Sequence, residues 1–156
     1  MTNKYFPTEN VTENDLFFVC YMIERVARKL HQPNQYVVDA LGYDELYRQL
    51  SLASVLHSEN PAKVENDWIV ENHLKPGTFD VTDVQKDLDI IIPTPAQMGK
   101  VYKRLILSTI GEGEDWVRAL LRIYSSPICG ILDNYNCSAY YEPSPAITRA
   151  YLHGGF

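Results

Sequence analysis

The chain has 156 residues, of which 46% are hydrophobic, 12% aromatic and 22% charged, a composition typical of one globular domain and not of disordered or collagen-like chains. Its longest uninterrupted apolar run, residues 16–23, is far shorter than the ~20 residues that a helix needs to cross a bilayer, so we expect no membrane span. Its net charge of -6 and its lack of a basic cluster argue against nucleic acid and anionic membranes as partners and leave proteins and small molecules.

Helix starts are clearly marked along the chain. At four places a residue that commonly caps a helix N-terminus stands directly before a proline, namely at Asn60, Thr94, Ser126 and Ser144. The cap accepts a hydrogen bond from an unpaired amide, and the proline that follows has no amide to leave unpaired. Each pair therefore predicts the start of a helix. Thr12 predicts a fifth start, with an acidic residue in the turn that follows it.

Five helices are predicted in the first part of the chain, over about residues 13–30, 34–41, 44–56, 61–74 and 81–88. In the first of them, apolar residues recur every three or four positions and form one face. The opposite, polar face of that helix carries Glu24, Arg25, Arg28 and Lys29. Gly42 predicts a left-handed stop between the second and third helices.

The second part of the chain continues the helical pattern. Residues 89–93 are the only strand candidate, and because they are too short to form a sheet alone, we interpret them as an extended linker. Four more helices are predicted after them, over about residues 95–110, 115–124, 127–134 and 145–153. The sequence thus predicts an all-α fold, a compact bundle of eight or nine short to medium helices without a significant sheet. We expect two helical halves, an acidic one over 1–90 and a second over 91–156, packed as one globular unit.

The cysteines and the N-terminal residues both predict a cytoplasmic protein. Cys20, Cys129 and Cys137 are odd in number and lack the Cys-x-x-Cys spacing, so we expect free thiols in a reducing compartment. The first ten residues contain neither the basic segment nor the apolar segment of a secretory signal.

No pattern in the sequence predicts a catalytic or metal site. The histidines, at positions 31, 57, 73 and 153, do not belong to two matched pairs of ligands spaced three or four residues apart on helices. Cys137 is the nucleophile considered, but neither a suitable histidine spacing nor a glycine-rich turn accompanies it. Residues 111–113 lack the Lys and Ser/Thr of a phosphate-binding loop. We therefore expect no metal and no cofactor, and favour a protein without enzymatic activity.

The segment 133–145 is the most distinctive polar region of the chain. It places three tyrosines among small polar residues, a composition typical of recognition surfaces. An ordered connection whose tyrosines fold back onto the helices would have the same composition. The candidate binding residues are Tyr135, Asn136, Cys137, Tyr140, Tyr141 and Arg149.

A second candidate surface is basic. Lys100 and Arg104 are four residues apart, as are Arg118 and Arg122, so each pair forms a stripe on its predicted helix. If the two helices lie side by side, the stripes would receive an acidic peptide or a phosphate; otherwise they form a solvated face. The acidic first half of the chain would also meet this basic stripe, within one molecule or across a dimer, because residues 1–92 hold eight basic and fifteen acidic residues.

Three stretches of the first half resemble a known family. They are FFVCYMIERVARKLHQPNQYVVDALG, VLHSENPAKVENDWIVENHL and DVTDVQKDL. Their order, over residues 14–88, is similar to a small bacterial helical domain of unknown function, whose members are often encoded beside ADP-ribosyltransferase-like toxins. The resemblance implies an antitoxin-like or accessory role and brings no catalytic residue. The residues after 88 have no counterpart in that family.

Two classes of function follow from these observations. The first is a non-enzymatic bacterial protein-interaction domain, antitoxin-like or accessory to a neighbouring gene product, for which an acidic surface would steer a basic partner. The alternative is a small-molecule-binding protein or enzyme with a site under loop 133–145. A concave pocket with convergent polar groups at that loop would favour this alternative. A homodimer that shares Phe17, Phe18, Tyr21 or Trp116 across a two-fold axis is also considered.

Overall fold

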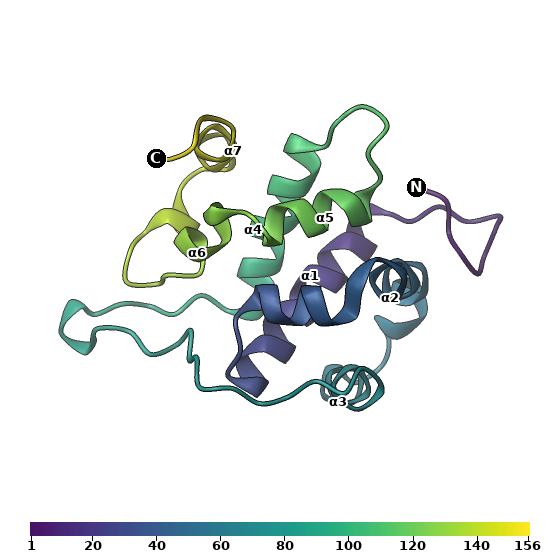
Figure 1. Ribbon diagram of the computed structural model, residues 1–156, viewed down its shortest axis with the longest axis horizontal. Helices are drawn as coiled ribbons and strands as arrows, with labels where there is room; N and C mark the ends of the chain where they lie inside the picture. The colour runs from purple at the N-terminus through teal and green to yellow at the C-terminus, as the bar shows by residue number, and fades with distance from the viewer.

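The computed structural model describes all 156 residues and consists of helices and loops, with one isolated β-bridge between Thr2 and Asn10 (Figure 1). The α-helices are α1 (Glu13–Leu30), α2 (Asn34–Leu56), α3 (Pro61–Glu71), α4 (Pro95–Thr109), α5 (Trp116–Tyr124), α6 (Pro127–Leu132) and α7 (Ser144–His153). Two single turns of 3-10 helix, η1 (Lys86–Leu88) and η2 (Ala139–Tyr141), complete the helical structure. The all-α class predicted from the sequence is confirmed.

Helix α1 is the central element of the fold. Its first half is apolar nearly all round, and side chains such as Leu16, Val19 and Met22 are fully excluded from solvent. It packs against α4 and α2 more extensively than against any other helix. One continuous hydrophobic core surrounds it, with side chains from the start of the chain at Val11 to the last helix at Ala150.

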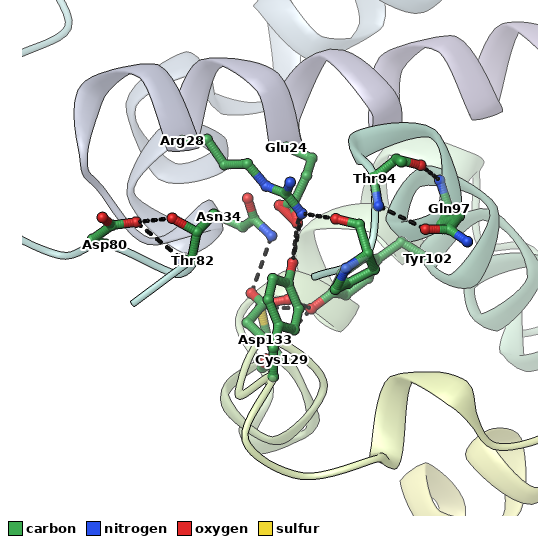
Figure 2. Close-up of polar contacts among 12 residues, drawn as sticks. Glu24, Arg28, Asn34, Asp80, Thr82, Thr94, Gln97, Tyr102, Cys129 and Asp133 are labelled. Carbon is green, nitrogen blue, oxygen red and sulfur yellow. Dashed lines mark hydrogen bonds and ion pairs between the residues drawn. The ribbon is translucent and has the colours of Figure 1, made fainter. Parts of the chain in front are cut away.

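Three of the predicted helix caps are confirmed. The Thr12 hydroxyl accepts a hydrogen bond from the Asp15 amide, and the Asp15 carboxylate accepts one from the Thr12 amide, which closes a capping box on α1. Thr94 and Gln97 form the same box at the start of α4 (Figure 2). The side chain of Asn60 accepts a hydrogen bond from an amide in the first turn of α3.

The predictions of Ser126 and Ser144 as side-chain caps are wrong. The Ser126 hydroxyl donates instead to the carbonyl of Ile123 in the preceding helix, at 2.7 Å, so α6 begins without a side-chain cap. Ser144 is itself the first residue of α7, and the residue before it is Pro143. Both helices still carry a proline in their first turn, where its missing amide costs no hydrogen bond.

The structure has seven α-helices where eight or nine were expected, for two reasons. The helices predicted on either side of Gly42 are joined in the single element α2, whose backbone kinks at Gly42 with φ 74° and ψ 179°. The helix predicted over 81–88 is wrong. The Asp80 side chain accepts hydrogen bonds from the amide and the hydroxyl of Thr82, and this local turn competes with helix formation, so that only η1 forms.

A long loop between α3 and α4, residues 75–93, extends away from the helices before it returns (Figure 1). We call this segment the linker. Two backbone hydrogen bonds fix its start against the end of α1: the Gly77 amide donates to the Leu30 carbonyl at 2.8 Å, and the Phe79 amide donates to the His31 carbonyl at 2.9 Å. The linker contains no strand, and η1 is its only helical turn.

The surface of the bundle bears on two of the earlier expectations. No helix combines the length and the apolar character that crossing a bilayer requires. Of the aromatic residues considered for a dimer, Phe18 is buried in the core of one chain, whereas Phe17, Tyr21 and Trp116 are half-buried at its edge. A dimer built on those residues stays a prediction.

The close packing of α4 on α1 depends on Gly99. A Cβ atom at this position would lie 3.0 Å from the backbone nitrogen of Tyr21 and 3.1 Å from its Cα. Because these neighbours are backbone atoms, a change of side-chain rotamer cannot relieve the overlap. Gly99 therefore sets the separation between the two helices.

We expect Gly99→Ala to lower the free energy of unfolding by ~1–3 kcal/mol, because the added methyl group forces α1 and α4 apart. Gly130→Ala in α6 is the matched control, since a Cβ atom there would meet nothing within 4 Å. Alanine is the better helix former, so the control is expected to be neutral or slightly stabilising. Urea unfolding followed by circular dichroism checks both variants, and equal effects would contradict the role given to Gly99.

Candidate functional site

A buried carboxylate on α1 organises the candidate site. Glu24 is only 2% exposed, and its Oε1 accepts hydrogen bonds from the Tyr135 hydroxyl and from Nη2 of Arg28, the latter at 3.2 Å (Figure 2). Glu24 and Arg28 lie four residues apart and so share one face of the helix. The sequence places both on the polar face of α1. At Glu24 that face is buried, and it meets Tyr135 of the loop after α6 there.

Arg28 connects three parts of the chain. Its Nη2 donates to the carbonyl oxygen of Pro93, at the end of the linker, at 2.7 Å and to the Tyr135 hydroxyl at 3.1 Å. Its guanidinium group also lies over the Tyr135 ring, 5.5 Å from the ring centroid, an arrangement that adds cation–π attraction. Helix α1, the linker and the loop after α6 are therefore held together through one side chain.

A second carboxylate, Asp133 at the end of α6, forms a neighbouring group of hydrogen bonds and feels the charge of Glu24. Its Oδ2 accepts hydrogen bonds from the side-chain amide of Asn34 at 3.0 Å and from the thiol of Cys129 at 3.3 Å. Its Oδ1 accepts a hydrogen bond from the Tyr102 hydroxyl at 2.7 Å. These donors come from α2, α6 and α4 and converge on Asp133 (Figure 2). We call Glu24, Arg28, Tyr135, Asp133, Asn34, Tyr102 and Cys129 the buried network.

The buried network contains one group that titrates near neutral pH. Burial raises the pKa of Asp133 to about 7, and the nearby charge of Glu24 acts in the same direction against the three donors. Burial also raises the pKa of the Cys129 thiol and of the Tyr135 hydroxyl, so both keep their protons at neutral pH. Asp133 is therefore the member of the buried network that exchanges a proton in the physiological range.

The buried network also leaves polar atoms without protein partners. Five buried side-chain atoms in the chain lack a hydrogen-bond partner, and three of them, Glu24 Oε2, Arg28 Nε and Asn34 Oδ1, belong to the network. Each such atom costs ~1–3 kcal/mol relative to a satisfied one. Unsatisfied buried groups in a native structure call for an explanation, such as a bound water or a functional role.

A cavity of about 310 Å³ lies beside the buried network, between the linker and the loop after α6. Asp133 and Tyr135 line one wall, and Phe79, Asp80 and Asp83 of the linker line the other. The two loops are joined at the cavity by a hydrogen bond of 2.8 Å from the amide of Gln85 to the side chain of Asn136. The cavity therefore lies between two loops that are hydrogen-bonded to each other.

The cavity carries negative charge. Its lining includes the three carboxyl groups of Asp80, Asp83 and Asp133 and no Lys, Arg or His side chain. Hydrogen bonds from the hydroxyl and the amide of Thr82 lower the pKa of Asp80, which keeps that carboxylate ionised. The cavity therefore attracts cations and repels anions.

Two of the six residues predicted as binding residues line the cavity. Tyr135 is buried with its hydroxyl in the network, and Asn136 holds the linker in place. Tyr140 packs its ring edge-on against Tyr135, with 5.4 Å between the centroids, but it lies outside the lining. Of the three tyrosines, Tyr135 alone both anchors the loop and faces the cavity.

The other three predicted residues lie elsewhere. Cys137 is exposed, with its thiol 3.2 Å from the carbonyl of Asn134. Tyr141 is exposed and points into a different groove beside α4. Arg149 lies on the exposed side of α7, at a shallow hollow that it shares with His153. The structure does not bring these side chains together with the cavity.

The predicted basic stripes do not form one surface. Arg122 is engaged within the chain by Glu114, at 2.7 Å and 2.9 Å, and by the hydroxyl of Tyr151 at 2.6 Å. The hydrogen bond to Glu114 is the main reason that the pKa of Arg122 is raised. Arg118 lies over the ring of Tyr43 and pairs with its own helix cap. Only the stripe of α4 remains open to a partner.

The sequence analysis missed the ionisable centre of the site. Asp133 stands at the edge of the segment 133–145 but was not singled out. The available signals were spacings of four residues: Glu24 and Arg28 on α1, and Cys129 and Asp133 at α6. Such spacings occur on many exposed helices, so they do not by themselves predict a buried network.

Comparison with known proteins gives no match to a family model, to a curated protein or to a solved structure. No group of three or more His, Cys, Asp or Glu side chains is placed to hold a metal ion. The cavity and the side chains that surround it are therefore the features that bear on function.

The raised pKa of Asp133 predicts that the stability of the protein depends on pH. An aspartate in an unfolded chain has a pKa of ~4, whereas the pKa of Asp133 in the folded state is about 7. Between these two pH values the folded state holds more protons than the unfolded state. The free energy of unfolding is therefore expected to fall as the pH rises through this range, by up to ~4 kcal/mol.

Asp133→Asn, which cannot titrate, is expected to remove most of this slope, whereas the control Asp39→Asn on the exposed side of α2 should keep it. Urea unfolding at a series of pH values measures both. A slope that persists in Asp133→Asn would show that another group causes it.

Proposed function

We propose that the protein binds a small organic cation in the cavity between the linker and the loop after α6. The cavity of about 310 Å³, which carries three carboxyl groups and no basic side chain, is the observation on which the proposal depends. Its volume lies at the lower end of the ~300–1,000 Å³ that is typical of small-molecule sites. Small-molecule binding at loop 133–145 is the alternative of the two functions that the sequence analysis considers.

The lining favours an amine, guanidine or amidine as the ligand. Carboxylates bind such groups through charge-assisted hydrogen bonds, and Asp133 of the loop after α6 and Asp83 of the linker both line the cavity. The exposed ring of Phe79 supplies an aromatic face for a cation. The Tyr135 ring is less available, because Arg28 already lies over it. A small ligand with a positive charge and a short apolar part fits these groups best.

Asp133 couples ligand binding to a proton. Its raised pKa means that the carboxyl group is partly protonated at neutral pH. A bound cation stabilises the ionised form, so binding is expected to release a proton near pH 6–7. A group with such a pKa is also suited to general acid–base catalysis, but the proposal is for binding alone, because burial keeps the adjacent Cys129 thiol protonated and unreactive.

The test is calorimetric titration with a panel of monoamines, diamines and guanidines, beside neutral isosteres and carboxylates of the same size. At least one cation is expected to bind, with a proton release that appears as a dependence of the binding enthalpy on the buffer. Asp133→Asn is expected to weaken that cation about tenfold or more.

Asp83→Asn on the opposite wall gives an independent variant, since Asp83 is exposed and a change there leaves the buried network intact. Asp39→Asn is the control outside the cavity. The proposal fails if no cation binds, or if the neutral isosteres and carboxylates bind as tightly as the cations.

A protein-interaction role in a bacterial cytoplasm, antitoxin-like or accessory to a neighbouring gene product, is the second candidate function. It is supported by apolar side chains that nothing in one chain covers: Ile91 is 85% exposed and Tyr141 is 80% exposed. The resemblance of residues 14–88 to the toxin-associated helical family supports the same role. The two functions use different surfaces, because neither Ile91 nor Tyr141 lines the cavity.

A further inference from the structure

A groove of about 220 Å³ runs between α4 and the segment that leads into α7. Lys100 and Arg104 from α4 line one side, and Tyr140 and Tyr141 line the other. The groove therefore joins two features that the sequence suggests separately, the basic stripe of α4 and the tyrosine-rich loop.

The two cations in the groove are free of ion pairs. Neither Lys100 nor Arg104 takes part in any of the eight salt bridges of the chain, and neither donates a side-chain hydrogen bond. Arg118 and Arg122, by contrast, each have a carboxylate partner. Glu142 also lines the groove but pairs with neither cation. In a chain with a net charge of -6, such unpaired cations favour an acidic occupant.

An uncovered apolar patch adjoins the groove. The hydroxyl of Tyr140 donates to the carbonyl of Ile91 at 3.1 Å, which places the end of the linker beside the tyrosine-rich loop. The side chains of Ile91 and Tyr141 point away from the core and are mostly exposed, and Leu88 in the same linker is exposed as well. Apolar groups gathered beside an open groove are typical of interaction surfaces.

The linker itself has the chemistry that the groove favours. Residues 80–89 contain four aspartates and one lysine, and Leu88 stands between Asp87 and Asp89. Asp87 and Asp89 are exposed and form no ion pair. The linker therefore does not neutralise the groove of its own chain, although it ends beside it. The acidic segment and the basic groove are both left open.

We propose that the protein forms a two-fold symmetric dimer in which the linker of each chain docks in the groove of the other. Asp87 and Asp89 of one chain meet Lys100 and Arg104 of its partner, and Leu88 packs on the exposed tyrosine ring. A two-fold axis repeats this contact, which enlarges the interface and pairs the exposed charges of both chains. The apolar patch at Ile91 is covered in the same assembly.

This proposal does not depend on cation binding in the cavity, and it differs from the dimer considered from the sequence. That dimer used Phe17, Phe18, Tyr21 or Trp116, none of which lines the groove. The interface proposed here uses charges of opposite sign on the same chain, so its strength is expected to fall with salt concentration.

Charge reversal on each side tests the pairing directly. The groove variant carries Lys100→Glu and Arg104→Glu, and the linker variant carries Asp87→Lys and Asp89→Lys. For each variant alone, the dissociation constant of the dimer is expected to be at least about tenfold higher than for the wild type. An equimolar mixture of the two restores opposite charges at both contacts and is expected to form a heterodimer. Sedimentation equilibrium and light scattering measure the masses, against 17.9 kDa for one chain.

Lys4→Glu with Lys75→Glu is the matched control, because it reverses two exposed cations that lie outside the groove. Circular dichroism checks that every variant is folded, as expected for changes at exposed positions. Three results would overturn the proposal: a wild type that stays a monomer at every accessible concentration, a dimer that survives the groove variant, or a mixture that fails to reassociate.

Discussion

The burial of Glu24 is the constraint from which the rest of the site follows. A carboxylate removed from water is tolerated only with close partners, and the loss of one partner typically costs ~3–5 kcal/mol. Glu24 finds its partners in Arg28 on the same helix and in Tyr135, more than a hundred residues further along the chain. Arg28 in turn holds the carbonyl of Pro93. One buried charge thus fixes the linker and the loop after α6 against the central helix.

The cavity and its chemistry are consequences of that arrangement. The two loops fixed by Glu24 and Arg28 line the cavity, and Asp133 belongs both to the buried network and to the cavity lining. Burial, together with the nearby Glu24 carboxylate, raises the pKa of Asp133, so this second carboxyl group keeps its proton to a higher pH. The same interactions that hold the loops in place therefore also adjust the group that a ligand would meet.

Local signals were sufficient to predict most helices but not the site. The caps at Thr12 and Thr94 and the break at Gly42 depend on neighbouring residues, and the structure reproduces them. The burial of Glu24 depends on Tyr135, and helix periodicity cannot reveal a partner so distant in the sequence, so a charged residue was assigned to the polar face. The helix missing at 81–88 follows from the turn that Asp80 and Thr82 form, which helix periodicity does not reveal.

The central claim, that Glu24 and Tyr135 stabilise one another in the folded state, is tested most directly by a double-mutant cycle with Glu24→Leu and Tyr135→Phe. Each single change leaves a buried polar partner unsatisfied, whereas the double change removes both. The account predicts a coupling free energy of ~1–3 kcal/mol from urea unfolding, and none between Glu24→Leu and Tyr140→Phe. Additive effects of the first pair, within ~0.5 kcal/mol, would contradict it.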